Sequence, residues 1–258
     1  MPHTANKHLV PLLLATIANH ASAQITPIEP VTDAMLQNAE ADSWLSWRGG
    51  PDAWGYSPLD QINRDNVGEL RLAWSWAMDD SGAGEAAPLV HDGVMYLPNP
   101  RGVIQALNAA NGDLLWEYRP GITAVAEDAN PITAEELGDA AMPATAYAGV
   151  GRGVQKNIAI YGDRIFSAGE NASLTAIDAN TGMLVWETRV ADPALGYHYT
   201  AGPIVANGVL ITGITGCTRF KDDVCFITGH DPVTGDELWR TATVAKPGEP
   251  GGDSWGAP

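Results

Sequence analysis

A repeated pattern of an aspartate or asparagine, a glycine and a tryptophan limits the fold of this chain more than any other feature. The three copies begin at Asn108, Asp178 and Asp231, and in each the Gly follows four residues later and the Trp eight residues later. An Asn or Asp side chain opens a turn by bonding to its own backbone, and Gly accepts the positive φ that closes the turn. A strand then begins, and its Trp is a large anchor between neighbouring sheets. The repeat therefore predicts similar sheets that stack in series.

Each copy follows a run of β-forming residues that is divided by a tight-turn pair: Asp92-Gly93, Gly162-Asp163 and Asn207-Gly208. Such pairs between short apolar runs are typical of β-hairpins. A hairpin, a turn and a Trp-bearing strand make a four-stranded antiparallel sheet, and radial repetition of that sheet makes a β-propeller. A blade takes roughly 40–50 residues, so the chain supports about four. The predicted fold class is all-β, with propeller blades of four-stranded antiparallel sheets.

The first residues have the pattern of a secretory signal peptide. Lys7 provides a weakly basic start, residues 9–15 are an apolar run too short to span a bilayer, and Ala21-Ser22-Ala23 is a small-residue exit. We therefore expect export to the periplasm. The predicted organisation is a signal peptide at 1–23, an N-terminal linker at 24–40 and a partial propeller domain at 41–258.

The charge and the two cysteines restrict the partners and the compartment. A net charge of −17 disfavours binding to nucleic acid or to anionic lipid, and no later segment is apolar enough to span a membrane. Cys217 and Cys225 are the only cysteines. An even count in an exported chain favours a disulfide between them, because a metal site would want more Cys or His nearby.

Beyond the repeats, the most specific stretch is Trp47-Arg48-Gly49-Gly50, which leads into Tyr56 to Asn63 and then Ala73-Trp74. Thr200 to Pro203 and the Gly-Asp-Ser-Trp-Gly tail add to it. These motifs resemble the pyrroloquinoline quinone (PQQ)-dependent alcohol dehydrogenases, whose catalytic subunit is an eight-bladed propeller. The likeness runs from about residue 41 to the last residue. It implies an incomplete ring of about four of eight blades.

The resemblance also implies a set of cofactor contacts near the propeller axis. Glu85 matches a glutamate that contacts the cofactor, although a solvated acid at the start of a strand is the alternative. Arg152 matches the arginine that holds the quinone, and its alternative is an ordinary surface arginine; a guanidinium suits carboxylate and quinone oxygens. The implied cofactor-binding residues are Glu85, Arg152, Thr200, Thr215, Gly216 and Cys217.

The sequence departs from the family pattern at two places: the cysteine ring that covers the quinone, and the metal site. The cysteines that form a ring over the quinone in methanol- and ethanol-oxidising members are replaced by Ala146 and Tyr147. Thr218 stands where the family has a metal-binding glutamate, and a hydroxyl is a poor ligand for Ca²⁺. We assign no metal ligand, although the family implies Ca²⁺ or a lanthanide in the full-length enzyme. The family's catalytic aspartate falls beyond Pro258, so we assign no catalytic residue and expect no activity from this chain alone.

The leading hypothesis is the N-terminal part of an exported PQQ-dependent alcohol dehydrogenase. Such an enzyme oxidises a small alcohol by hydride transfer to the bound quinone and passes electrons to a c-type cytochrome. No Cys-x-x-Cys-His haem motif is present in the chain. Two alternatives stay open: a non-catalytic propeller scaffold of the outer-membrane assembly type, and a quinoprotein that acts on sugars or aldehydes.

Overall fold

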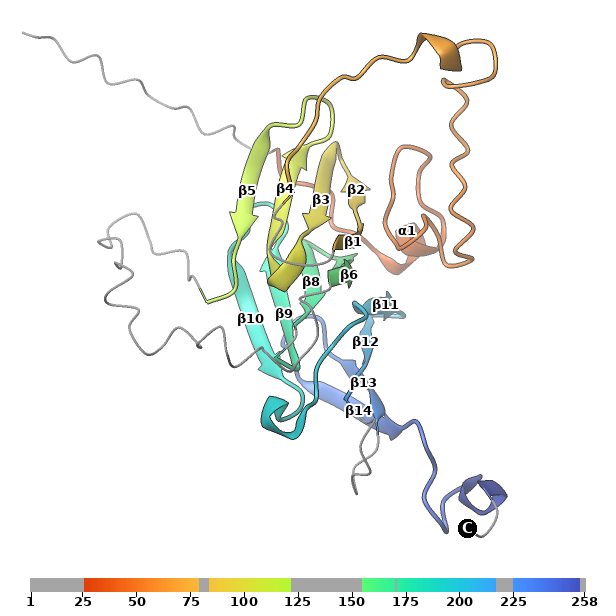
Figure 1. Ribbon diagram of the computed structural model, residues 1–258, viewed down its shortest axis with the longest axis vertical. Helices are drawn as coiled ribbons and strands as arrows, with labels where there is room; N and C mark the ends of the chain where they lie inside the picture. Colours follow the sequence, from red (N-terminus) through yellow and green to blue (C-terminus); the bar gives the residue numbers. More distant parts are fainter. Residues whose placement is uncertain (1–25, 79–83, 122–154, 170, 217–224, 256–258) are drawn as a thin grey trace, which may run out of the picture.

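A computed structural model describes residues 26–78, 84–121, 155–169, 171–216 and 225–255. Three four-stranded antiparallel sheets follow one another along the chain, as the repeat predicts. Figure 1 shows them in series, from yellow through cyan to blue. The first sheet comprises β2 (Leu89–His91), β3 (Val94–Pro98), β4 (Ile104–Asn108) and β5 (Leu114–Tyr118); the second comprises β7 (Ala159–Tyr161), β8 (Arg164–Ala168), β9 (Ser173–Asp178) and β10 (Leu184–Arg189); the third comprises β11 (Ile204–Ala206), β12 (Val209–Gly213), β13 (Phe226–His230) and β14 (Glu237–Ala242).

A short parallel pair joins the first two sheets. It consists of β1 (Gly84–Ala87) and β6 (Gln155–Asn157), each of which directly precedes the first strand of its sheet. The remaining elements are single turns of helix, namely α1 (Asp33–Gln37), η1 (Val67–Glu69), η2 (Pro100–Gly102), η5 (Pro193–Leu195) and η6 (Gly252–Trp255). None of the helices in these described ranges is long and apolar enough to cross a membrane.

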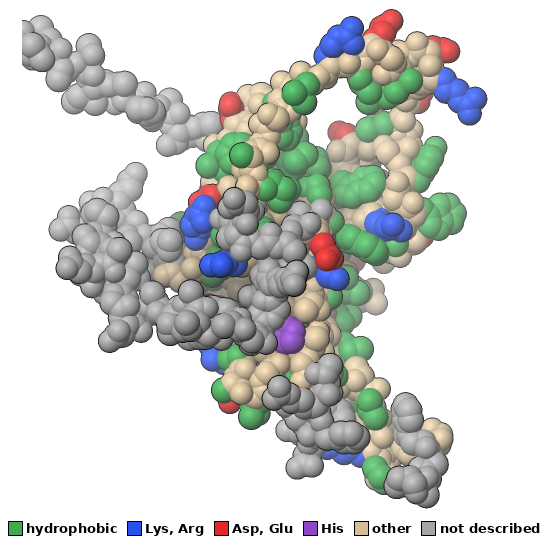
Figure 2. Space-filling model, in the orientation of Figure 1, with side chains coloured by type: hydrophobic (Ala, Val, Ile, Leu, Met, Phe, Trp, Pro, Cys, Tyr) green, Lys and Arg blue, Asp and Glu red, His purple; other side chains and the backbone are tan. Residues whose placement is uncertain are grey.

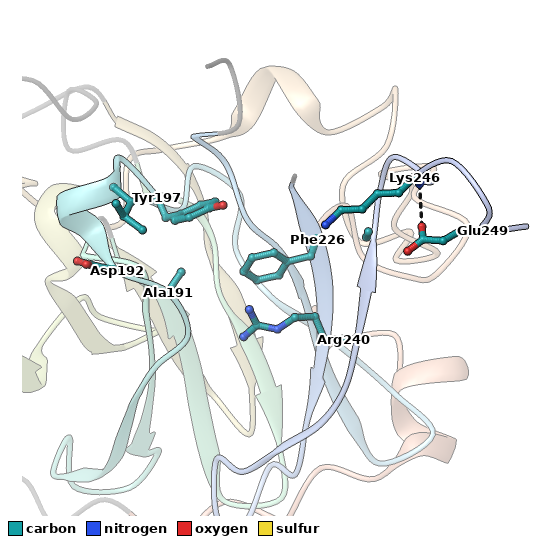
Figure 3. Close-up of a pocket in the computed structure, with 9 residues that line it drawn as sticks. Ala191, Asp192, Tyr197, Phe226, Arg240, Lys246 and Glu249 are labelled. Atoms are coloured by element: carbon teal, nitrogen blue, oxygen red, sulfur yellow. Dashed lines mark hydrogen bonds between the residues drawn. The ribbon is translucent and has the colours of Figure 1, made fainter. Parts of the chain in front are cut away.

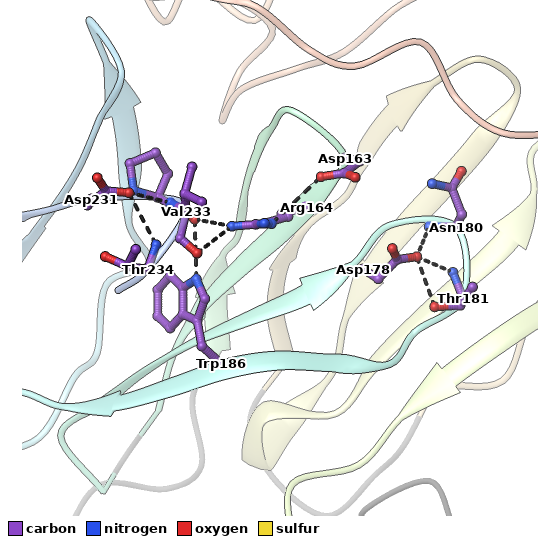
Figure 4. A network of polar contacts seen from close by, with 10 residues as sticks. Asp163, Arg164, Asp178, Asn180, Thr181, Trp186, Asp231, Val233 and Thr234 are labelled. Atoms are coloured by element: carbon purple, nitrogen blue, oxygen red, sulfur yellow. Dashed lines mark hydrogen bonds and ion pairs between the residues drawn. The ribbon is translucent and has the colours of Figure 1, made fainter. Parts of the chain in front are cut away.

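The turn chemistry expected from the sequence is confirmed in all three repeats. In the second, Oδ1 of Asp178 accepts hydrogen bonds from the amides of Asn180 at 3.0 Å and Thr181 at 2.8 Å (Figure 4). The glycine that closes this turn, Gly182, has φ +75°. An L-residue with a Cβ rarely adopts that conformation, which is why glycine stands there.

The tryptophans of the first two repeats dock on the turn of the next sheet. The indole N–H of Trp116 donates to the carbonyl of Ala179 at 3.0 Å, and that of Trp186 donates to Pro232 at 3.2 Å (Figure 4). In both cases the acceptor lies three residues before the turn glycine, and the ring covers that glycine. The sheets are therefore joined by one large apolar contact and one directed hydrogen bond each.

Trp74 makes the same contact one repeat earlier, which the sequence reading did not recognise. Its indole N–H donates to Ala109 at 3.1 Å, and its ring covers Gly112. The segment around Trp74 is extended but is assigned no strand. The described residues thus hold three complete blades and one further docking tryptophan, where about four blades were expected.

Two apolar cores lie between the sheets. The first contains Tyr96 and Trp116 from the first sheet with Ile160, Ile165 and Ile177 from the second. The second core contains side chains of the second and third sheets, and its members are Ala159, Phe166, Ala168, Ala172, Leu174, Ala176, Val190, Tyr197, Tyr199, Leu210, Ile214 and Phe226. Burial of such side chains is the main stabilising contribution, so each sheet depends on its neighbour.

The N-terminal stretch at 24–40, for which the sequence suggests a linker, is folded against the sheets from residue 26 onward. Val31 pairs with Gly162 in an isolated bridge and is buried. Asp33 accepts a hydrogen bond from the hydroxyl of Tyr161 at 3.0 Å and another from the amide of Gly208 at 3.1 Å. Burial and this bond to Asp33 raise the pKa of Tyr161. The stretch therefore links the hairpins of the second and third sheets.

The segment that follows, up to Leu72, leaves many large apolar side chains in solvent. Trp54, Tyr56 and Leu72 are the most exposed of them. Figure 2 shows hydrophobic side chains gathered along this part of the chain, apart from the sheets. The sheets bury part of their apolar side chains in the two cores, whereas others, such as Val185, Ile204 and Leu238, are exposed.

Candidate functional site

Glu85 lies on β1 and forms an ion pair with Lys156 on β6. The distance from Nζ of Lys156 to Oε2 of Glu85 is 3.1 Å. The pairing of β1 with β6 brings the two side chains together, because Gly84 is opposite Gln155 and Ala87 is opposite Asn157. The ion pair thus connects the two short strands that precede the first and second sheets. Both side chains are about half exposed, at 55% and 46%.

The next residue of β6, Asn157, contacts the loop that precedes the third sheet. Its Oδ1 accepts the amide N–H of Gly202 at 3.0 Å, and its Nδ2 donates to the carbonyl of Pro203 at 3.3 Å. A Cβ at Gly202 would collide with the backbone of Asn157, so a glycine is required for this close approach. Asn157 therefore holds the loop before β11 of the third sheet against β6.

That loop carries Thr200, whose hydroxyl lies 3.3 Å from the hydroxyl of Thr215. A two-residue ladder positions them, because the amide of Thr215 donates to the carbonyl of His198 at 2.9 Å and the reverse bond is 3.1 Å. Gly216 has φ +106°, and a Cβ there would collide with the carbonyl of Gly196. The structure thus brings together three of the residues implied by the resemblance: Thr200, Thr215 and Gly216.

The tyrosine next to this site is a structural group. Tyr199 is buried in the core between the second and third sheets. Burial raises its pKa, so the phenol stays neutral across the physiological range. Its neighbour Thr200 is only partly buried, and its hydroxyl pairs with that of Thr215.

These residues form two polar groups connected by β6. One is the Glu85–Lys156 ion pair, and the other is the hydroxyl pair Thr200–Thr215. A hydroxyl donates to carboxylate oxygens, and an ammonium both donates and supplies charge. The donor set therefore suits a ligand with several carboxylates.

Sequence reasoning missed Lys156 and Asn157. A signal was present, since Gln155, Lys156 and Asn157 are three polar residues directly before an apolar strand. Their partners, however, are set by a parallel pairing between distant strands, which the local pattern does not reveal. The structure adds them to the candidate site.

Several predicted residues lie outside the described part of the chain. They are Arg152 and Cys217, together with Ala146, Tyr147 and Thr218. Cys225 is half-buried directly before β13, and its pairing with Cys217 stays a prediction. Within the described ranges, no three His, Cys, Asp or Glu side chains are grouped so that they could hold a metal ion. The predicted signal peptide at 1–23 also lies outside the described residues.

A separate hollow of about 340 Å³ lies between the second and third sheets (Figure 3). Arg240 on β14 crosses it, with its guanidinium 4.0 Å from the ring centre of Phe226 and a hydrogen bond to the carbonyl of Val190 at 3.0 Å. Arg240 also hydrogen bonds to Glu237 and lowers the pKa of that carboxyl. Of the predicted cofactor contacts in the described part of the chain, none lines this hollow.

Comparison with known proteins identifies the family. Residues 44–257 match the family described as PQQ, glucose/ethanol/alcohol dehydrogenase, beta-propeller domain. A quinohemoprotein alcohol dehydrogenase of Pseudomonas putida, ADH-IIG, is 35% identical over 213 residues, which are 82% of this chain and 26% of that protein.

Solved structures agree in fold. Quinohemoprotein alcohol dehydrogenase ADHIIG from Pseudomonas putida HK5 matches with a TM-score of 0.73 and 32% identity, over 90% of this chain and 32% of that one. A europium-containing methanol dehydrogenase matches with a TM-score of 0.68 and 25% identity, over 84% of this chain and 34% of that one. The chain spans about a quarter to a third of the length of these relatives. It belongs to the PQQ-dependent alcohol dehydrogenase family of β-propellers.

Proposed function

We propose that this chain provides part of the PQQ-binding site of an exported alcohol dehydrogenase. The observation that carries the proposal is that polar side chains of the β1–β6 pair are linked through Asn157 to the threonine loop beside the third sheet, in a chain of this family. PQQ has three carboxylates and an ortho-quinone, so its binding needs hydroxyl donors and positive charge. Thr200, Thr215 and Lys156 supply such groups.

Each residue has a distinct role in this proposal. In the hydroxyl pair of Thr200 and Thr215 one O–H donates to its partner, and the other O–H donates to a carboxylate oxygen of the ligand. Gly216 lets the backbone come close to the flat ring system. Asn157 keeps the threonine loop in register with β6, so the donors are in place before the ligand arrives. Arg152 and Cys217 complete the proposed contacts, as the family resemblance implies.

The bound quinone would supply the hydride acceptor for oxidation of a small alcohol. The remaining proposals are export to the periplasm, a Ca²⁺ or lanthanide ion in the full-length enzyme, and a c-type cytochrome as electron acceptor. The quinohemoprotein and the europium-containing protein among the relatives support the metal ion and the cytochrome, and the predicted signal peptide at 1–23 is the basis for export.

A binding titration tests the proposal without turnover. The chain is titrated with PQQ, and quenching of tryptophan fluorescence is followed to saturation. We expect saturable binding at one PQQ per chain, weakened by roughly three- to tenfold in Thr215→Val because a hydroxyl donor is lost. Thr241→Val, a change of the same shape on the exposed strand β14, is the matched control and should bind as the wild type does. Failure of the wild-type chain to bind PQQ would contradict the proposal.

A further inference from the structure

Lys156 is distinguished from the other described residues of the candidate site by its positive charge. The described segments that build the site are residues 84–87, 155–157 and 196–216, and Lys156 is the only Lys or Arg in them. The chain as a whole has a net charge of −17. An anionic ligand is therefore repelled by the protein unless a local cation offsets that field.

The ammonium of Lys156 is held in place but keeps capacity for a second partner. Its ion pair with Glu85 at 3.1 Å uses one of three N–H donors. With 46% of its side chain exposed, the group is reachable from solvent. An ion pair this exposed contributes little to folding stability, so stability alone does not account for it.

The position of Lys156 ties it to the rest of the site. Its neighbour Asn157 holds the loop that carries Thr200. A carboxylate near Glu85 would meet like charge, and a cation directly beside Glu85 removes that repulsion. The ion pair thus makes the acid at this position compatible with an anionic ligand.

We propose that Lys156, held by Glu85, binds a carboxylate of PQQ. This inference rests on the proposed function, because it names a further contact in the same cofactor site. It concerns binding alone and requires no chemical step.

Equilibrium dialysis of PQQ against the intact chain tests the inference. We expect Lys156→Gln to bind PQQ roughly fivefold more weakly than the wild type, since a half-exposed charged contact is lost. The wild type should also lose more affinity than Lys156→Gln between about 20 mM and about 200 mM salt, because screening acts on the removed contact. Lys246→Gln, an exposed lysine outside the site, is the matched charge control and should stay within about twofold of the wild type.

Glu85→Gln separates ligand binding from a merely structural ion pair. It breaks the same ion pair but keeps the ammonium, so it should lose less affinity for PQQ than Lys156→Gln does. Equal losses in Glu85→Gln and Lys156→Gln would overturn the inference. Unchanged binding in Lys156→Gln, or an equal loss in Lys246→Gln, would overturn it as well. Absence of binding by the wild type would instead overturn the proposed function.

Discussion

Trp116 donates its indole N–H to the carbonyl of Ala179 at 3.0 Å, which ties the outermost strand of the first sheet to a turn of the second. The two residues are 63 positions apart in the chain. Opposite Trp116 on β4 stands Ala106, and opposite Trp186 on β9 stands Ala176. A small residue behind each ring leaves room for the indole to lie flat between two sheets.

Replacement of a docked tryptophan should be costly, whereas the equivalent change in the last repeat should not. Trp116→Phe loses the hydrogen bond to Ala179 and part of the buried ring, so we expect the free energy of unfolding to fall by roughly 1–3 kcal/mol. Trp239 occupies the same position in the third repeat but is 40% exposed, against 8% for Trp116. Trp239→Phe should therefore cost less than about 1 kcal/mol. Urea unfolding of both variants measures the difference, and equal losses would argue against docking as the link between sheets.

Replacement of a turn glycine by alanine should cost more stability where a docked tryptophan ring covers the glycine. Gly182 and Gly93 have nearly equal φ, +75° and +74°, so the backbone strain of a Cβ is alike. At Gly93 a Cβ would meet nothing within 4 Å, whereas at Gly182 it would lie 2.7 Å from Cε3 of Trp116.

We therefore expect Gly93→Ala to cost roughly 1–2 kcal/mol and Gly182→Ala to cost roughly 1–3 kcal/mol more. The additional cost of Gly182→Ala measures the displacement of the docked Trp116 ring. Thermal or urea unfolding gives both values, and similar costs for the two variants would contradict the proposed packing.

The side chain of Asn157 should control local opening of the loop before β11. Asn157→Ala removes the acceptor for the amide of Gly202, so that amide should exchange with solvent about tenfold faster for each 1.4 kcal/mol lost. The amide of Gly208, bonded to Asp33, is an internal control and should keep its rate. Native-state hydrogen exchange measures both amides in one sample. If the Gly202 amide is equally protected in the variant, Asn157 does not hold the loop.

Stability should decline in mild acid because of a buried histidine. His230 is fully buried and its Nδ1 lies 3.1 Å from the carbonyl of Gly235. Burial lowers its pKa, so the folded state disfavours the proton that the unfolded state accepts. Stability is therefore complete above the ordinary histidine pKa of about 6.5 and falls as the pH drops below it.

The test compares how steeply the free energy of unfolding changes with pH in the variant and in the wild type. The free energy of unfolding is measured between pH 7.5 and pH 5.5, roughly the range in which histidine titrates. His230→Asn keeps a donor for Gly235 but cannot take up a proton, so its slope should be shallower by up to about 1.4 kcal/mol per pH unit. Identical slopes for the variant and the wild type would assign the acid sensitivity to other groups.

The candidate site was only partly accessible from the sequence. Glu85, Thr200, Thr215 and Gly216 were implied by motif resemblance, and the structure places Thr200 beside Thr215. Lys156 and Asn157 escaped notice because their partners lie on other sheets. No spacing rule links Lys156 to Glu85, since the parallel pairing of β1 with β6 depends on how two sheets stack.

The amino-acid sequence by itself determined the turns and the repeat. Asp178 bonds to amides two and three residues ahead, so the turn needs no distant contact. The tertiary structure alone decided which ring meets which turn and which charges meet between sheets, as in the contacts of Trp74 with Ala109 and of Lys156 with Glu85. The physical reason is that turn geometry depends on neighbours in the chain, whereas docking depends on burial that exists only once the sheets have stacked.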